Sequence, residues 1–92
     1  MEIKVIEKGA LFIINLKSNP TAGFVWELMD LPDSFELVFT QFLPDKELPG
    51  SGGNDKFVFK PMMRGIFHLR FVMKRKWEAE PISEEIFEIQ VK

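Results

Sequence analysis

Residues 67–74 read Phe67-His68-Leu69-Arg70-Phe71-Val72-Met73-Lys74, with a large apolar side chain at every odd position. A period of two, rich in aromatic and β-branched residues, is typical of a β-strand with one buried face. The same alternation recurs in residues 12–16 and 87–91. Only residues 82–91 offer a helical alternative, and their second half alternates too regularly for a helix. The sequence therefore predicts an all-β protein.

Turn-forming residues divide the chain into seven expected strands. Glycine and proline lie between the alternating stretches, as tight turns require. The expected strands cover residues 2–8, 10–17, 24–29, 35–43, 55–60, 65–74 and 83–91. Short strands at this spacing favour an immunoglobulin-like β-sandwich of about seven antiparallel strands.

The length and charge of the chain limit what it can be. Its 92 residues make one domain, residues 1–92, and leave no room for a second. Lys and Arg total 12 and Asp and Glu total 14, which gives a formal net charge of −2. A binder of nucleic acid or of an anionic membrane normally carries an excess of basic residues, so we expect neither partner.

The chain contains no cysteine and one histidine, His68. Disulfides, thiolate zinc sites, cysteine nucleophiles and histidine-rich metal sites are therefore excluded, and we expect no metal and no cofactor. A single histidine without a clear orienting acid makes a catalytic triad a poor prediction, so we expect no catalytic residues and no enzyme. The first residues lack the pattern of a signal peptide, which gives an expectation of a cytoplasmic protein.

Three loops carry the unusual sequence. If each strand crosses the whole sandwich, the chain changes ends at every loop. The loops after the second, fourth and sixth strands then lie at one end, and the remaining loops lie at the other. Because binding residues concentrate on loops, we expect function at the first end.

The loop after the second strand reads Asn19-Pro20-Thr21-Ala22-Gly23. Proline fixes its own φ, Asn19 can accept hydrogen bonds from the backbone that follows it, and Gly23 permits a positive φ. A tight turn without further function is the alternative. The loop after the fourth strand contains Gly50, Ser51, Gly52 and Gly53. It could be a plain linker, or it could let the backbone of another protein approach closely; a phosphate site is disfavoured because no Gly-Lys-Ser/Thr follows.

The loop after the sixth strand contains Arg75, Lys76 and Trp77. Trp26 is the expected core tryptophan, facing inward with Phe24 and Leu28. Trp77 lies among charged residues and is expected to be exposed. Tryptophan beside arginine is typical of a protein interface, although the ring could instead lie flat over a sandwich edge.

Together, these three motifs, in this order on seven expected strands, resemble those of the chagasin-like inhibitors of papain-family cysteine proteases. That family shows Asn-Pro-Thr-Thr-Gly-aromatic with a Trp two residues on, then Gly-x-Gly-Gly, then Arg-Pro-Trp. Residues 19–26 and 50–53 match the first two motifs, with Ala22 in place of the second threonine. In residues 75–77, Lys76 replaces the proline. The similarity covers the whole chain.

The resemblance implies a reversible, tight-binding inhibitor that blocks the active-site cleft of the protease. The first loop, residues 19–24, would enter the cleft as a wedge with Thr21 near the catalytic Cys–His pair. The loop with residues 50–53 would lie along one side of the cleft, and residues 75–77 would cover the other. We expect a monomer. The alternative is an immunoglobulin-like interaction module without inhibitory activity.

Overall fold

The computed structural model describes residues 1–19, 22–45, 52–75 and 77–92. Its seven strands are β1 (Glu2–Ile6), β2 (Phe12–Ser18), β3 (Phe24–Asp30), β4 (Phe35–Pro44), β5 (Gly53–Pro61), β6 (Gly65–Arg75) and β7 (Ser83–Val91). Each predicted strand is present, and its ends differ from the prediction by at most two residues. Within the described residues, no helix is long and apolar enough to cross a membrane.

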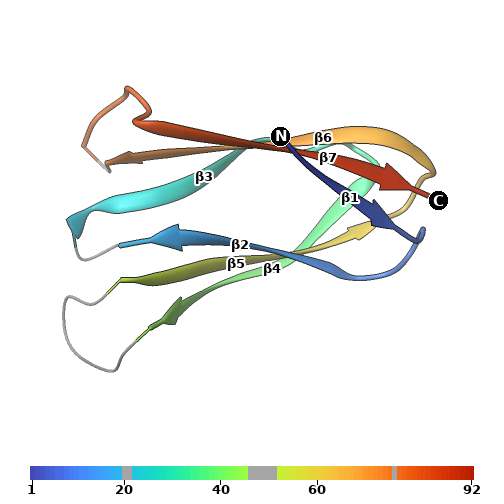
Figure 1. Ribbon diagram of the computed structural model, residues 1–92, viewed down its shortest axis with the longest axis horizontal. Coiled ribbons are helices and arrows are strands. Elements are labelled where there is room, and N and C mark those ends of the chain that lie inside the picture. The colour runs from blue at the N-terminus through green and yellow to red at the C-terminus, as the bar shows by residue number, and fades with distance from the viewer. Residues whose placement is uncertain (20–21, 46–51, 76) are drawn as a thin grey trace.

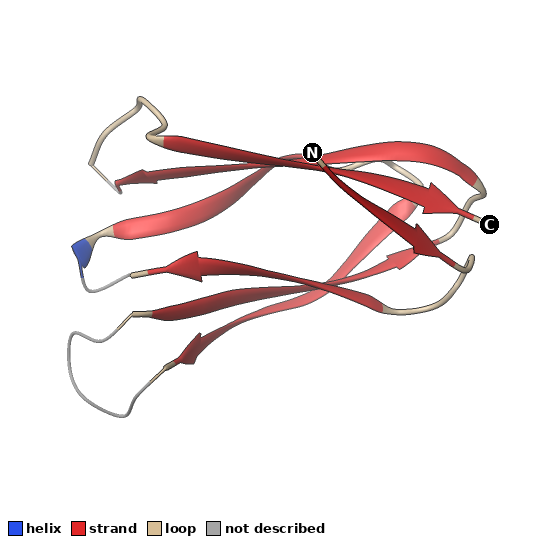
Figure 2. Cartoon of the chain, viewed as in Figure 1, coloured by secondary structure: helices blue, strands red, loops and turns tan. Residues whose placement is uncertain are grey.

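The strands form two sheets that face each other, as Figures 1 and 2 show. One sheet has the strand order β1-β7-β6-β3, and the other has the order β2-β5-β4. This is the predicted immunoglobulin-like β-sandwich. One detail of the prediction is wrong, because β1 runs parallel to β7 while the other strand pairs are antiparallel. The five-residue β1 joins the sheet beside β7, the last strand of the chain, and the alternating pattern of a strand does not show which strand will be its neighbour.

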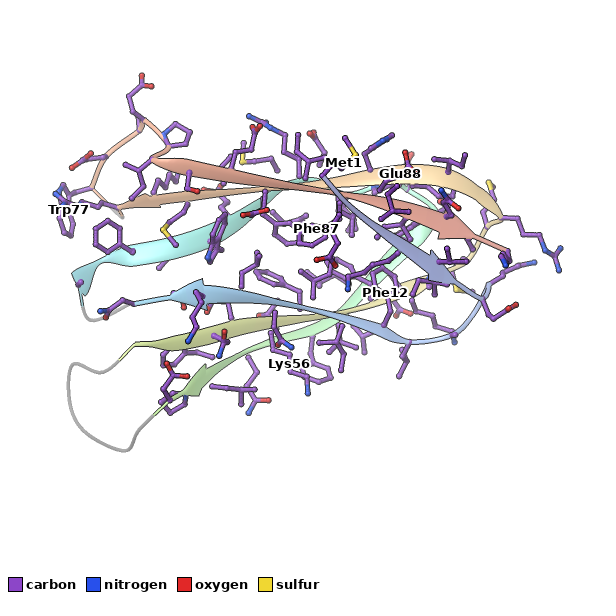
Figure 3. The ribbon with its side chains drawn as sticks, viewed as in Figure 1. Met1, Phe12, Lys56, Trp77, Phe87 and Glu88 are labelled. Carbon is purple, nitrogen blue, oxygen red and sulfur yellow. The ribbon has the colours of Figure 1, made fainter. Side chains whose placement is uncertain are left out.

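Phenylalanine rings fill the space between the sheets. Phe59 and Phe71 come from opposite sheets, are fully buried, and have ring centroids 6.3 Å apart. Phe71 also packs edge-on against Phe87 and lies 4.9 Å from the ring of Phe57. Figure 3 shows Phe12 and Phe87 in this layer. Offset and edge-to-face pairs of this kind add to the free energy of burial, so the aromatic layer holds the two sheets together.

The outward-facing side chains of the β1-β7-β6-β3 sheet form ion pairs. Arg70 lies 2.6 Å from Glu84, and Lys74 lies 2.9 Å from Glu27. His68 is exposed on the same face and lies 3.6 Å from Glu88, as the outward position of His68 in the alternating pattern predicted. These pairs are largely exposed and contribute little to stability.

The strand ends that carry the three unusual loops lie at one end of the sandwich (Figure 1). Strands β2, β4 and β6 end there, and strands β3, β5 and β7 begin there. The prediction that the loops after the second, fourth and sixth strands share one end is therefore confirmed. The opposite end carries the turn with Met62 and Met63, both exposed.

The aromatic layer gives a first prediction. Phe59→Ala should lower the free energy of unfolding by about 3–5 kcal/mol, because it opens a cavity at a fully buried position. Ile13→Ala is the matched control, since the Ile13 side chain is 44% exposed on β2, the other neighbour of β5. Urea denaturation measures both changes. Equal losses for the two variants would contradict the role given to the aromatic layer.

Candidate functional site

The loop between β2 and β3 is closed by Asn19. The Asn19 carbonyl oxygen accepts hydrogen bonds from the backbone N–H groups of Ala22 and Phe24, each at 3.1 Å. The side-chain Oδ1 of Asn19 accepts a third, from Ala22 N, at 3.3 Å. Gly23 has φ of 87°, in the left-handed region that favours glycine. The predicted roles of Asn19 and Gly23 in the turn are confirmed; Pro20 and Thr21 lie outside the described residues.

Trp26 anchors the base of this loop. Its indole Nε1–H donates to the backbone carbonyl of Lys17 on β2, at 2.6 Å. The two residues belong to opposite sheets, so this hydrogen bond joins the sheets directly beneath the loop. The ring packs against the buried core beside Leu28, as predicted.

Trp77, on the loop between β6 and β7, lies over the loop between β2 and β3. Its side chain is 68% exposed, as predicted, and lies at the loop end of the molecule (Figure 3). A Cβ atom placed on Gly23 would lie 2.6 Å from two atoms of the Trp77 ring. The ring therefore packs directly on the Gly23 backbone. Two sequence motifs that lie more than fifty residues apart in the chain meet at this contact.

Arg75 lies between aromatic rings of the same two loops. Its guanidinium carbon is 5.0 Å from the ring centroid of Phe24 and 5.9 Å from that of Trp77. Its Nη1 is 3.5 Å from Oε1 of Glu78. Cation–π contacts at exposed sites are each worth about 0.5–1 kcal/mol. Arg75 thus binds residues of its own chain, and Lys76 beside it lies outside the described residues.

The loop between β4 and β5 is closed at its base. Asp45 N donates to the carbonyl of Gly52 at 3.0 Å, and the Asp45 carboxylate lies 3.3 Å from Nζ of Lys17 on β2. A Cβ atom on Gly52 would lie 3.2 Å from the carbonyl oxygen of Ser18. Gly50 and Ser51 lie outside the described residues.

Gly53 is required by the packing of its own strand against β4. A Cβ atom there would overlap the carbonyl oxygen of Leu43 and would lie 2.8 Å from the ring of Phe42. The backbone that approaches Gly53 is therefore that of its own neighbouring strand, β4. A valine at this position would damage the fold itself, so it cannot test contact with another protein.

The described residues of the three motifs lie together at one end of the molecule. Gly23 and Phe24 contact Trp77 and Arg75, which joins the first loop to the third. Lys17 and Ser18, at the end of β2, contact Asp45 and Gly52, which joins the first loop to the second. Among the described residues, no group of three or more His, Asp and Glu side chains is placed to hold a metal ion. This end of the molecule presents an exposed indole ring beside a hydrogen-bonded turn, a combination typical of protein interfaces.

Comparison with known proteins matches residues 5–91 to the family model described as "Chagasin family peptidase inhibitor I42". Chagasin from Trypanosoma cruzi is 32% identical over an alignment 92 residues long. The alignment covers 91% of this chain and 82% of chagasin. Among solved structures, the cysteine protease inhibitor EhICP2 from Entamoeba histolytica superposes with a TM-score of 0.85 at 22% identity, covering 99% of this chain and 86% of that one. PbICP-C, solved in complex with falcipain-2, gives a TM-score of 0.69 at 18% identity, covering 98% and 86% of the two chains. At these identities the two solved structures show a shared fold.

The packing of Trp77 on Gly23 gives a second prediction. Gly23→Ala should destabilise the fold by about 1 kcal/mol or more, because alanine is strained at a positive φ. It should also push the Trp77 ring away, which would change the Trp77 indole N–H signal in an NMR spectrum.

Gly9→Ala is the matched control. Gly9 has a similar φ of 82°, but a Cβ atom there would meet nothing within 4 Å. This variant should show the loss from strain while leaving the Trp77 signal in place. If Gly23→Ala also left that signal unchanged, the contact between the two loops would be refuted.

Proposed function

The chain belongs to the chagasin family of peptidase inhibitors, and on that basis we propose that it is a reversible, tight-binding inhibitor of papain-family cysteine proteases. Its three loops would block the active-site cleft of the protease. The observation that carries the proposal is the joining of the first and third loops through Gly23, Phe24, Arg75 and Trp77. A surface fixed before binding loses little conformational entropy on binding, which is what tight inhibition requires.

The loop between β2 and β3 acts as the wedge. Asn19 holds the turn closed with three hydrogen bonds, so the backbone doubles back within a few residues. A protease cleft binds its substrates as extended chains. A closed turn places no peptide bond in line with the catalytic thiolate, so the loop fills the cleft without being cut. The family motif assigns the tip of this wedge to Pro20 and Thr21, with Ala22 behind them.

The loop between β6 and β7 supplies an aromatic anchor. The Trp77 ring packs on Gly23 through its Cη2 and Cζ3 atoms, and the side chain is still 68% exposed, so the ring offers surface to a partner. A rigid, exposed tryptophan is a frequent hot spot of protein interfaces. Arg75 supports this ring from within the inhibitor, which makes it a positioning residue.

The loop between β4 and β5 flanks the cleft on the other side. Gly50, Ser51 and Gly52 present a backbone with little side-chain bulk, which favours main-chain pairing with the protease. The hydrogen bond from Asp45 N to the Gly52 carbonyl sets where this loop leaves the sandwich. A contact of ordinary size would bury about 1,600 Å² in total over the three loops.

Titration of papain with the purified protein tests the proposal. Trp77→Ala should raise the inhibition constant about 30-fold, which corresponds to about 2 kcal/mol for the loss of a hot-spot side chain. The control is Met63→Ala, which removes a 58% exposed side chain from the opposite end and should leave the constant unchanged. Equal constants for Trp77→Ala and the parent would remove Trp77 from the interface. No inhibition by the parent protein at micromolar concentration would favour an interaction module of another kind.

A further inference from the structure

The outer edge of β4 is free of a neighbouring strand in the described part of the chain. We propose that the protein forms a two-fold symmetric dimer in which the β4 strands of two copies pair antiparallel, edge to edge. This surface is separate from the three loops, and the dimer does not depend on the proposed inhibitory function. It would replace the monomer expected from the sequence.

The β4 strand lies at the end of the β2-β5-β4 sheet and, in the described part of the chain, pairs only with β5. Figure 1 shows it along the outer side of that sheet. Its ten residues leave a long row of backbone donors and acceptors facing away from β5. Proteins protect such edges with short strands, charged residues, proline or bulges. The bulge of β4 lies between Leu37 and Phe39 and leaves the edge beyond it regular. Glu36 is the only charged residue within Phe35–Pro44.

The other edge strands are better protected. The five-residue β1 carries Glu2 and Lys4, and β3 carries Glu27 and Asp30. On β2, the backbone carbonyl of Lys17 already accepts the hydrogen bond from Trp26. The β4 strand therefore stands out as both the longest edge strand and the least charged for its length.

Apolar side chains are exposed on both faces of β4. The register shifts between Leu37 and Phe39, so Val38 and Phe39 lie opposite the single residue Val58. The extra residue of a bulge changes which of the following side chains point to each face of the sheet. Five large apolar side chains are left 36–45% exposed: Leu37, Val38, Phe39, Phe42 and Leu43. A long edge strand with exposed apolar side chains favours pairing with a strand of another chain.

A second copy of the chain can pair with the free backbone N–H and C=O groups of β4 without bringing like charges together. The bulge lies between Leu37 and Phe39, so residues 39–43 form the regular part of the edge. In an antiparallel pair centred on Gln41, each Phe39 lies opposite Leu43 of the partner strand, and both side chains lie on the same face. The two Glu36 residues are then about 34 Å apart along the pair, at roughly 3.4 Å per residue. The apolar residues at positions 39–43 meet those of the other copy, as an isologous contact requires.

The symmetry leaves both loop ends accessible. Since β4 runs toward the loop end, antiparallel pairing directs the loop ends of the two copies away from each other. Each copy could therefore bind a protease while the dimer stays intact.

Sedimentation equilibrium tests the dimer in the absence of any protease. The mass of the parent protein should rise with concentration from 10.7 kDa toward twice that value. Phe39→Lys, within the proposed contact, should keep the mass at the monomer value. Ile13→Lys is the matched control, because Ile13 is 44% exposed on β2, at the opposite edge of the same sheet, compared with 45% for Phe39. It should dimerise as the parent does.

Hydrogen exchange of the parent protein gives a test that needs no variant. At high concentration, amides along the whole of β4 should be protected, and dilution should expose those facing away from β5 while leaving β5 protected. A parent mass that stays at the monomer value up to about 1 mM, the weak end of the affinity range, would overturn the proposal. So would loss of the dimer in Ile13→Lys, or β4 exchange that does not change with dilution.

Discussion

The indole ring of Trp77 rests on the bare backbone of Gly23, and the shape of the loop end depends on this contact. It is possible because glycine has no Cβ atom and because residue 23 adopts a positive φ that glycine tolerates. The contact brings the loop that follows β6 onto the loop that follows β2. Arg75 then fits beside Phe24 and Trp77 and completes the junction.

The rest of the sandwich supplies a rigid base for that junction without any covalent cross-link, since the chain has no cysteine. Phe59 and Phe71 meet between the sheets, and Trp26 donates its hydrogen bond across to Lys17 just below the first loop. The aromatic layer and this hydrogen bond hold the ends of β2 and β3 at a fixed distance. The family similarity over residues 5–91 extends over this base as well as over the loops.

Local sequence patterns were sufficient to predict the elements and their direction. The alternation in residues 67–74 and 87–91 predicted β6 and β7, because a period of two depends only on which face of a strand is buried. Chain direction then placed the three motifs at one end. Their resemblance to a known family supplied the expected target, which no composition or spacing in the chain could have given.

Contacts between distant residues could not be predicted in the same way. The parallel neighbour of β1, the packing of Trp77 on Gly23 and the overlap of Gly53 with the backbone of β4 all depend on tertiary placement. Gly53 shows the limit clearly, because a glycine required by its own fold and one required by a partner look alike in sequence. The bulge near Val38 could not be predicted either. It changes which side chains of β4 face outward, and this is known only from the register of β4 against β5.

The central claim is that a closed turn, fixed by neighbouring loops, occupies a protease cleft without being cut. The most direct measurement is to titrate active papain with the protein and then determine the mass of the recovered chain. The account predicts that one molecule of the protein inhibits one papain active site and that papain activity returns when the complex dissociates. It also predicts that the chain is recovered uncleaved, at its full 10.7 kDa. Cleavage within residues 19–24, or full protease activity in the presence of excess protein, would contradict it.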